Sequence, residues 1–200
     1  MSKQKRHLTF LSSIPWLLVL ALICTSCISV RRVTPAPPLV VADFDGCTGA
    51  NNLGGDMGAA YNSPDSLKES YVEEANRGCV ARLQYEISDW AAFWIKMLGS
   101  DLKPYNKLAF DVKADSEPGI PGQMKLELKR ANGTEIAIAH VAGIGSDWKR
   151  IRIDLADFRP TGQNPPLATR EGMEELVFTF EATTSGRQGV IYLDNIVVER

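Results

Sequence analysis

Histidine is almost absent from this chain of 200 residues, which holds only His7 and His140. A metal site built on several histidines is therefore excluded, and a catalytic triad would depend on His140 alone. The GxSxG and HExxH motifs are also missing, and the glycine-rich stretch GGDMG (54–58) lacks the Lys-Ser/Thr pair of a phosphate-binding loop. Because no catalytic motif is present, we expect a protein that is not an enzyme.

Long apolar runs are scarce, and the clearest one lies at the N-terminus. Three basic residues precede an apolar segment at 14–23, and Cys27 follows. This is the layout of a secretory signal, and it resembles a bacterial lipoprotein signal peptide (1–26) that is cleaved before a cysteine that then carries lipid. An uncleaved membrane anchor over 8–30 is the alternative, although the apolar core is short for a membrane span.

A lipid on Cys27 would anchor the protein at the cell envelope. Ile28 follows this cysteine, in place of the aspartate that retains lipoproteins in the inner membrane. By analogy with bacteria that have two membranes, this favours the outer membrane. The segment 27–38 is a Pro-rich tether without periodicity, and the remaining residues, 39–200, are enough for one domain with a full core.

Basic residues are too few to suggest nucleic acid as a partner. Three of the 22 basic residues and none of the 24 acidic residues lie in 1–26. The rest of the chain therefore has a net charge of about −5, which disfavours binding to a polyanion.

Cysteine is also rare. Once Cys24 has left with the leader and Cys27 has taken the lipid, only Cys47 and Cys79 remain. An even pair in an oxidising compartment predicts a disulfide between the first long loop and the strand that begins at Cys79. Closing this loop of about 32 residues would contribute about 3 kcal/mol. Two buried free thiols are the alternative.

Period-2 alternation is what the sequence has in abundance. Leu108, Phe110 and Val112 alternate with Ala109, Asp111 and Lys113, as expected for a strand with one apolar and one polar face. Asn132-Gly133 is typical of a hairpin turn, helix signals are weak, and the long loops are 45–66 and 157–172. We expect strands near 39–44, 67–74, 79–87, 92–98, 108–113, 124–129, 134–141, 150–155, 176–181 and 189–199. This pattern predicts an all-β fold, a two-sheet antiparallel β-sandwich of the jelly-roll type.

Acidic residues stand inside the otherwise apolar first and last strands. Unpaired carboxylates are costly to bury, so these acids need partners. Several motifs occur in a fixed order: DFD (43–45), NNLGG (51–55), AAFWIKML (91–98), DLKPYNKLAFDVKAD (101–115), WKRIRIDLADF (148–158), MEELVFTF (173–180) and IYLDNIVVE (191–199). Their order and spacing resemble the galactose-binding-like jelly rolls, especially family 11 carbohydrate-binding modules and the related complex I intermediate-associated domain.

The resemblance implies a structural calcium near the chain ends and a glycan groove on one sheet face. Asp45 and Asp194 match the family's acids in the first and last strands, with Asp43 as a third candidate ligand. Calcium needs six to eight oxygens, so loop carbonyls would have to supply the rest. Alternatively, Asp43 and Asp45 are turn-forming acids that bond backbone amides.

Glycan binding needs flat rings for sugar faces and planar polar groups for hydroxyls. The candidate residues are Trp94, Trp90, Tyr61, Asp111, Glu127 and Arg152. If Phe93 and Ile95 point inward, Trp94 points outward, but a lone tryptophan in a β-sandwich is more often a core residue, and we favour that position for it. For most charged residues of the sheet faces we favour ordinary ion pairs between strands, and we keep Asp111, Glu127 and Arg152 as candidates for the groove.

Three functions fit these observations. The first is a non-catalytic, lipid-anchored module that binds a polysaccharide or oligosaccharide at the cell envelope. The second is a structural or assembly lipoprotein that binds another envelope protein. The third is a small envelope glycoside hydrolase, which would need two carboxylates across a cleft.

Overall fold

The computed structural model describes residues 35–162 and 165–200, and its contacts group residues 36–200 into one compact unit. The predicted signal peptide (1–26) and Cys27 lie outside the described residues. Within the described residues, no helix has the length and apolar character that crossing a bilayer requires.

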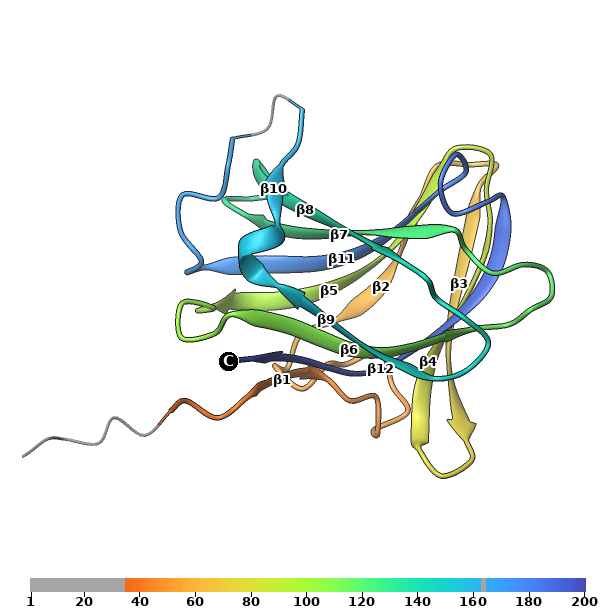
Figure 1. The fold of residues 1–200 in the computed structure, drawn as a ribbon, viewed down its shortest axis with the longest axis horizontal. Helices are drawn as coiled ribbons and strands as arrows, with labels where there is room; N and C mark the ends of the chain where they lie inside the picture. The colour runs from red at the N-terminus through yellow and green to blue at the C-terminus, as the bar shows by residue number, and fades with distance from the viewer. Residues whose placement is uncertain (1–34, 163–164) are drawn as a thin grey trace, which may run out of the picture. The chain divides into compact units, whose positions relative to one another are not determined.

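Two antiparallel sheets pack face to face (Figure 1). The first sheet has the order β3 (Ser66–Glu74), β4 (Gly78–Glu86), β12 (Gln188–Glu199), β6 (Lys107–Ala114) and β9 (Lys149–Asp154), with β1 (Leu39–Ala42) also paired to β12. The second sheet has the order β10 (Arg159–Pro160), β8 (Glu135–Ala142), β7 (Gln123–Arg130), β11 (Met173–Glu181), β5 (Trp90–Ser100) and β2 (Met57–Tyr61). The fold is the predicted all-β sandwich, and its first and last strands are neighbours.

The core lies between the sheets and follows the period-2 alternation. On β5, Phe93 and Ile95 are fully buried while Trp94 between them is not. Aromatic rings connect the layers: Phe110 of β6 meets Phe178 of β11 edge to face, with ring centroids 5.3 Å apart. Such packing accounts for much of the stability, since burial of each large apolar side chain contributes about 2 kcal/mol.

Two strands lie in segments that the sequence predicted to be loops. The predicted loop 45–66 contains β2 (Met57–Tyr61), and the loop 157–172 contains the short strand β10. The sequence of β2 is MGAAY, which lacks the alternation of large apolar and polar residues that marks the other strands. The predicted hairpin at Asn132-Gly133 is confirmed, since both residues have positive φ between β7 and β8.

The predicted disulfide is also confirmed. Cys47 and Cys79 are bonded, with their Cα atoms 5.5 Å apart. The bond ties the loop after β1 to the start of β4.

Candidate functional site

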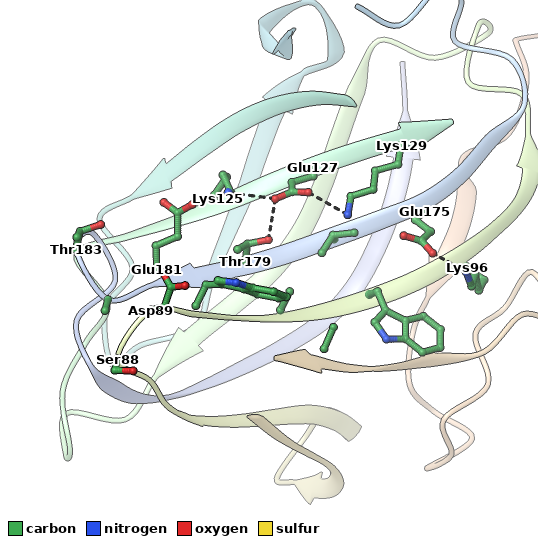
Figure 2. Close-up of a pocket in the computed structure, with 16 residues that line it drawn as sticks. Ser88, Asp89, Lys96, Lys125, Glu127, Lys129, Glu175, Thr179, Glu181 and Thr183 are labelled. Carbon is green, nitrogen blue, oxygen red and sulfur yellow. Dashed lines mark hydrogen bonds and ion pairs between the residues drawn. The ribbon is translucent and has the colours of Figure 1, made fainter. Parts of the chain in front are cut away.

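A groove of about 830 Å³ lies on the outer face of the second sheet (Figure 2). The sheet register explains how it forms, because Glu127 of β7 lies opposite Val177 of β11, which lies opposite Trp94 of β5. The residues that line the groove are Ala60, Ser88, Asp89, Trp90, Ala92, Trp94, Lys96, Lys125, Glu127, Lys129, Glu175, Val177, Thr179, Glu181, Ala182 and Thr183. Alternate residues of four strands therefore share this face, with tryptophan on one side and charged residues on the other.

Trp94 lies in this groove, so the core position that the sequence favoured for it is wrong. Its neighbours Phe93 and Ile95 fill the core, and the two-residue period then turns Trp94 outward. The indole rests on β2: its Nε1 donates a hydrogen bond of 3.3 Å to the carbonyl oxygen of Ala59, and a Cβ on Gly58 would lie only 2.8 Å from its Cζ2 atom. Gly58 and the other small residues of β2 made this strand hard to predict, and they leave the space in which the indole of Trp94 packs.

Trp90 is held in the groove by Asp65, a residue that the sequence analysis missed. Asp65 is 4% exposed, and its carboxylate accepts hydrogen bonds from the backbone amides of Ser88, Asp89 and Trp90 at 2.8–2.9 Å. Hydrogen bonds from the Ser88 amide and hydroxyl are the main reason that the pKa of Asp65 is lowered to about 2. Ser-Pro-Asp at 63–65 signals a turn, but the amides it fixes are more than twenty residues away.

Charged side chains form ion pairs across the groove, with a network around Glu127 of β7 and a separate pair between Lys96 and Glu175 (Figure 2). Glu127 lies between Lys125 and Lys129, 3.2 Å from each ammonium, and accepts a hydrogen bond from the Thr179 hydroxyl at 3.1 Å. Two further ion pairs of 2.5 Å flank it, Lys125–Glu181 and Lys96–Glu175. Each lysine of the network is thus matched by a carboxylate.

The ion pairs shift the pKa of two members of the network, Glu127 and Lys125, in the direction that favours the charged form. Burial alone would raise the pKa of Glu127, but the charges and hydrogen bonds of Lys129 and Lys125 outweigh it and lower the pKa. Burial would likewise lower the pKa of Lys125, and its contacts with Glu181 and Glu127 raise it instead. The groove therefore offers fixed ammonium donors and carboxylate acceptors beside its aromatic rings.

The structure brings together three of the six predicted glycan-binding residues. Trp90, Trp94 and Glu127 line the groove. Tyr61 is 47% exposed at the end of β2 but does not line it. Two residues belong to the first sheet: Asp111 of β6 bonds Arg77 and Arg150, and Arg152 of β9 bonds Glu199.

The acids predicted to bind calcium do not form a common set of ligands. Asp43 bonds the side chain of Asn52 and the amide of Asp45, which is the turn-forming role of the alternative interpretation. Asp194, 2% exposed, is bonded by Arg77 and Asn195. Among the described residues, the one group of three side chains close enough to share a metal ion is Cys47, Glu73 and Cys79. The two cysteines of this group are joined in the disulfide. A calcium site stays a prediction that the residues present do not fit.

Known proteins are similar to this chain in structure, whereas sequence comparisons find no match. No protein-family model matches the chain, and a search of curated proteins finds no significant relative. A family 11 carbohydrate-binding module from Clostridium thermocellum, in complex with a β-1,3-1,4-mixed-linked tetrasaccharide, is similar with a TM-score of 0.65 at 17% identity, covering 83% of this chain and 97% of the module. The fold is that of a jelly-roll carbohydrate-binding module.

Other solved structures agree on the fold. A variant of a family 29 carbohydrate-binding module complexed with mannohexaose is similar with a TM-score of 0.55 at 16% identity, over 82% of this chain and 92% of that one. An agarase is similar over 81% of this chain but only 26% of its own length, at 10% identity and a TM-score of 0.55. At these identities the likeness shows the fold alone, which the resemblance in the sequence predicted.

Proposed function

We propose that this protein is a non-catalytic module that binds a carbohydrate chain in the groove over β2, β5, β11 and β7. The observation that carries the proposal is the presence of Trp90 and Trp94 in one groove, on the same face of β5. Four residues of strand separate them by about 13 Å, which is longer than one pyranose ring. Two platforms at this distance suit an oligosaccharide that runs along the strand, with one sugar ring near each indole.

The charged network supports the same function. Sugar hydroxyls are both donors and acceptors, and the ion pairs of Lys125 and Glu127 present both kinds of group in fixed positions. Ala92 lies between Trp90 and Trp94 on β5, opposite Ala60 of β2, and these two small residues leave room above the sheet. Aromatic rings with a few oriented polar groups are the usual composition of a small-molecule site.

Hydrolysis is supported less well than binding. A glycosidase needs one carboxyl group that is protonated near neutral pH, which requires a raised pKa. Lysine neighbours lower the pKa of Glu127 instead, and Glu175 and Glu181 each contact a lysine ammonium at 2.5 Å. The printed names of the family 11 and family 29 neighbours are those of binding modules, which agrees with a role without catalysis.

We further propose that the module is a lipoprotein of the cell envelope, anchored through Cys27. The basic, apolar and cysteine segments of the leader support this assignment, as does the disulfide, which fits an exported protein. The exposed large apolar side chains of the described residues, Val40, Tyr61, Leu98 and Ile120, lie on different elements. Among the described residues, no single strand or loop therefore presents two of these side chains as part of an apolar docking patch.

A polysaccharide panel tests the binding proposal. The purified protein would be screened against immobilised glycans that include mixed-linked β-1,3-1,4-glucan and mannan, which the structural neighbours suggest as probes. We expect retention by at least one polysaccharide and competition by its soluble oligosaccharides. Retention by none of the panel would contradict the proposed function. Metabolic labelling with a fatty acid, compared between the wild type and Cys27→Ser, tests the anchor separately.

A further inference from the structure

Two carboxylates lie side by side on the outer face of the first sheet. Asp194 of β12 is the register partner of Asp111 of β6. Like charges directly opposite each other on neighbouring strands destabilise a sheet unless a cation lies between them. Asp194 is also 2% exposed, so water cannot screen the repulsion well.

Arg77 supplies this cation from the turn between β3 and β4. Its Nη1 atom lies 2.8 Å from Asp194 Oδ2 and 3.0 Å from Asp111 Oδ2, so one guanidinium bridges both acids. Arg150 of β9 adds a contact of 3.2 Å to Asp111, and Asn195 donates its amide and side-chain N–H groups to Asp194 at 2.8 and 2.9 Å. Both oxygens of Asp194 are therefore occupied by protein donors.

The aromatic ring of Trp148 also contacts the guanidinium of Arg77. The Arg77 guanidinium lies 4.1 Å from the centroid of the Trp148 ring, within the range of a cation–π contact. Trp148 in turn packs against Tyr192 of β12, with centroids 6.4 Å apart. Arg77 therefore contacts the ring of Trp148 as well as the two carboxylates, whose side chains are only 14% and 3% exposed.

The cluster includes Asp194, one of the two acids that the family resemblance assigns to a calcium ion. That ion would join Asp45, from the loop after β1, to Asp194 of the last strand. In this structure the turn of Arg77 and Gly78 lies between them: Arg77 bonds Asp194, and a Cβ on Gly78 would lie 3.0 Å from Asp45 Oδ1. The turn of Arg77 and Gly78 therefore lies against both of the acids that would share the ion.

We infer that the guanidinium of Arg77 does in this protein what a structural calcium does in related jelly rolls, so that the fold is stable without metal. Two arginines balance two aspartates within the cluster, and a divalent ion would add uncompensated positive charge. This inference does not depend on the groove, because all of its residues belong to the first sheet or to loops beside it.

Melting of the purified wild-type protein in EDTA and in millimolar calcium chloride is the first test. A ligand that binds only the native state must raise the melting temperature by linkage. We expect the same midpoint in both buffers, to within about 1 °C. A midpoint several degrees higher in calcium would overturn the inference.

Substitution of Arg77 is the second test. Arg77→Met keeps the length of the side chain and removes the charge, and we expect the midpoint to fall by roughly 5 °C or more. Arg82→Met is the matched control, because Arg82 also lies on this face, and its one side-chain bond within residues 35–162 and 165–200 is to the neutral side chain of Gln84. Arg77→Lys should recover part of the loss. Equal midpoints for Arg77→Met and the wild type would overturn the inference.

The pH dependence separates lost charge from lost packing. Burial is the main reason that the pKa of Asp194 is raised, and removing the guanidinium would raise it further. A carboxyl with a raised pKa in the folded state favours folding when protonated, so the deficit of Arg77→Met should be smaller at pH 5 than at pH 8. A deficit that is equal at both pH values would contradict a charge role. If Arg77→Met does not fold, Arg77→Lys and the calcium titration still decide the outcome.

Discussion

The outer faces of the two sheets contain the same kinds of side chain in different arrangements. On the second sheet, Trp90 and Trp94 line a groove and the lysines bond carboxylates beside them. On the first sheet, Trp148 is covered by cations, with Arg77 at 4.1 Å and Lys113 at 5.3 Å from its ring centroid. Lys96 also lies 5.3 Å from the centroid of Trp94, and both Lys96 and Lys113 pair with a carboxylate. The close stacking of Arg77 on Trp148 is therefore what distinguishes the first sheet.

This difference shows that the composition of a sheet face does not define its role. Tryptophan next to charged residues lines a groove where the charges pair with each other. It forms a structural cover where the cation has to stack on the ring to neutralise buried acids. We therefore expect changes on the second sheet to affect binding and changes on the first sheet to affect stability.

The largest effect should come from the two tryptophans that the comparison contrasts. Trp94→Ala should weaken binding of the glycan found in the panel by about 30-fold or more, since buried tryptophans are frequent hot spots. Trp148→Ala should leave affinity unchanged and lower the melting temperature, because it uncovers the Arg77 cluster. Isothermal titration calorimetry and thermal melting measure the two quantities. Loss of affinity in both variants would show that the faces are not separate.

Substitution of Gly58 tests whether the position of the Trp94 ring, and not only its presence, determines the affinity for the glycan. Gly58→Val places a side chain where a Cβ would lie 2.8 Å from the indole, so the ring must move. Because valine suits a β-strand, we expect the fold to persist and the affinity to fall by roughly 10-fold. Gly145→Ala is the control, since no atom lies within 4 Å of a Cβ there. Unchanged affinity and tryptophan fluorescence in Gly58→Val would contradict this role.

Removing the disulfide, which lies beside the first sheet, should lower the stability of the fold without affecting binding. Replacing Cys47 and Cys79 together by serine should lower the melting temperature by about 6–12 °C, because the bond closes a loop of 32 residues. Affinity for the glycan should stay the same when it is measured well below the midpoint. A loss of affinity at that temperature would mean that the groove depends on this loop.

The smallest effect should come from Asp65, which fixes the backbone of Trp90. Asp65→Asn turns an acceptor of several N–H groups into a poorer one, and we expect a loss of a few-fold in affinity. Asp101→Asn is the control, because Asp101 also accepts a backbone amide but does not line the groove.

The lowered pKa of Asp65, about 2, also predicts a pH dependence. Its contribution to stability is present above about pH 4, the pKa of an unfolded aspartate, and is lost as the pH falls towards 2. The melting temperature should therefore fall less steeply between pH 7 and pH 2 for Asp65→Asn than for the wild type. Identical slopes would show that Asp65 does not carry this dependence.

Much of the fold could be predicted because each strand repeats one simple pattern. The alternation of Leu108, Phe110 and Val112 signals a face that must be buried, and the structure buries all three. The strand β2 could not be found this way. Its Gly58 and Ala60 are small because Trp94 and the groove lie over them, and that reason is tertiary.

Less of the site could be predicted, because its geometry depends on contacts between distant parts of the chain. Because Phe93 and Ile95 are buried, the two-residue repeat of the strand turns Trp94 outward, but the general tendency of tryptophan to be buried favoured the opposite face. The partner of Asp194 is Arg77, which lies 117 residues earlier in a turn. An acid in an apolar strand signals that a partner exists, but the sequence does not distinguish an arginine from an ion.

Nuclear magnetic resonance of the indole N–H groups tests the contrast between the faces most directly. The glycan that the panel retains would be titrated into the ¹⁵N-labelled protein, with the indole signals assigned by substitution of each tryptophan. We predict that the signals of Trp90 and Trp94 shift on binding and that the signal of Trp148 does not. A shift of Trp148 alone, or no shift of any indole at saturation, would contradict the assignment of the binding face to the second sheet.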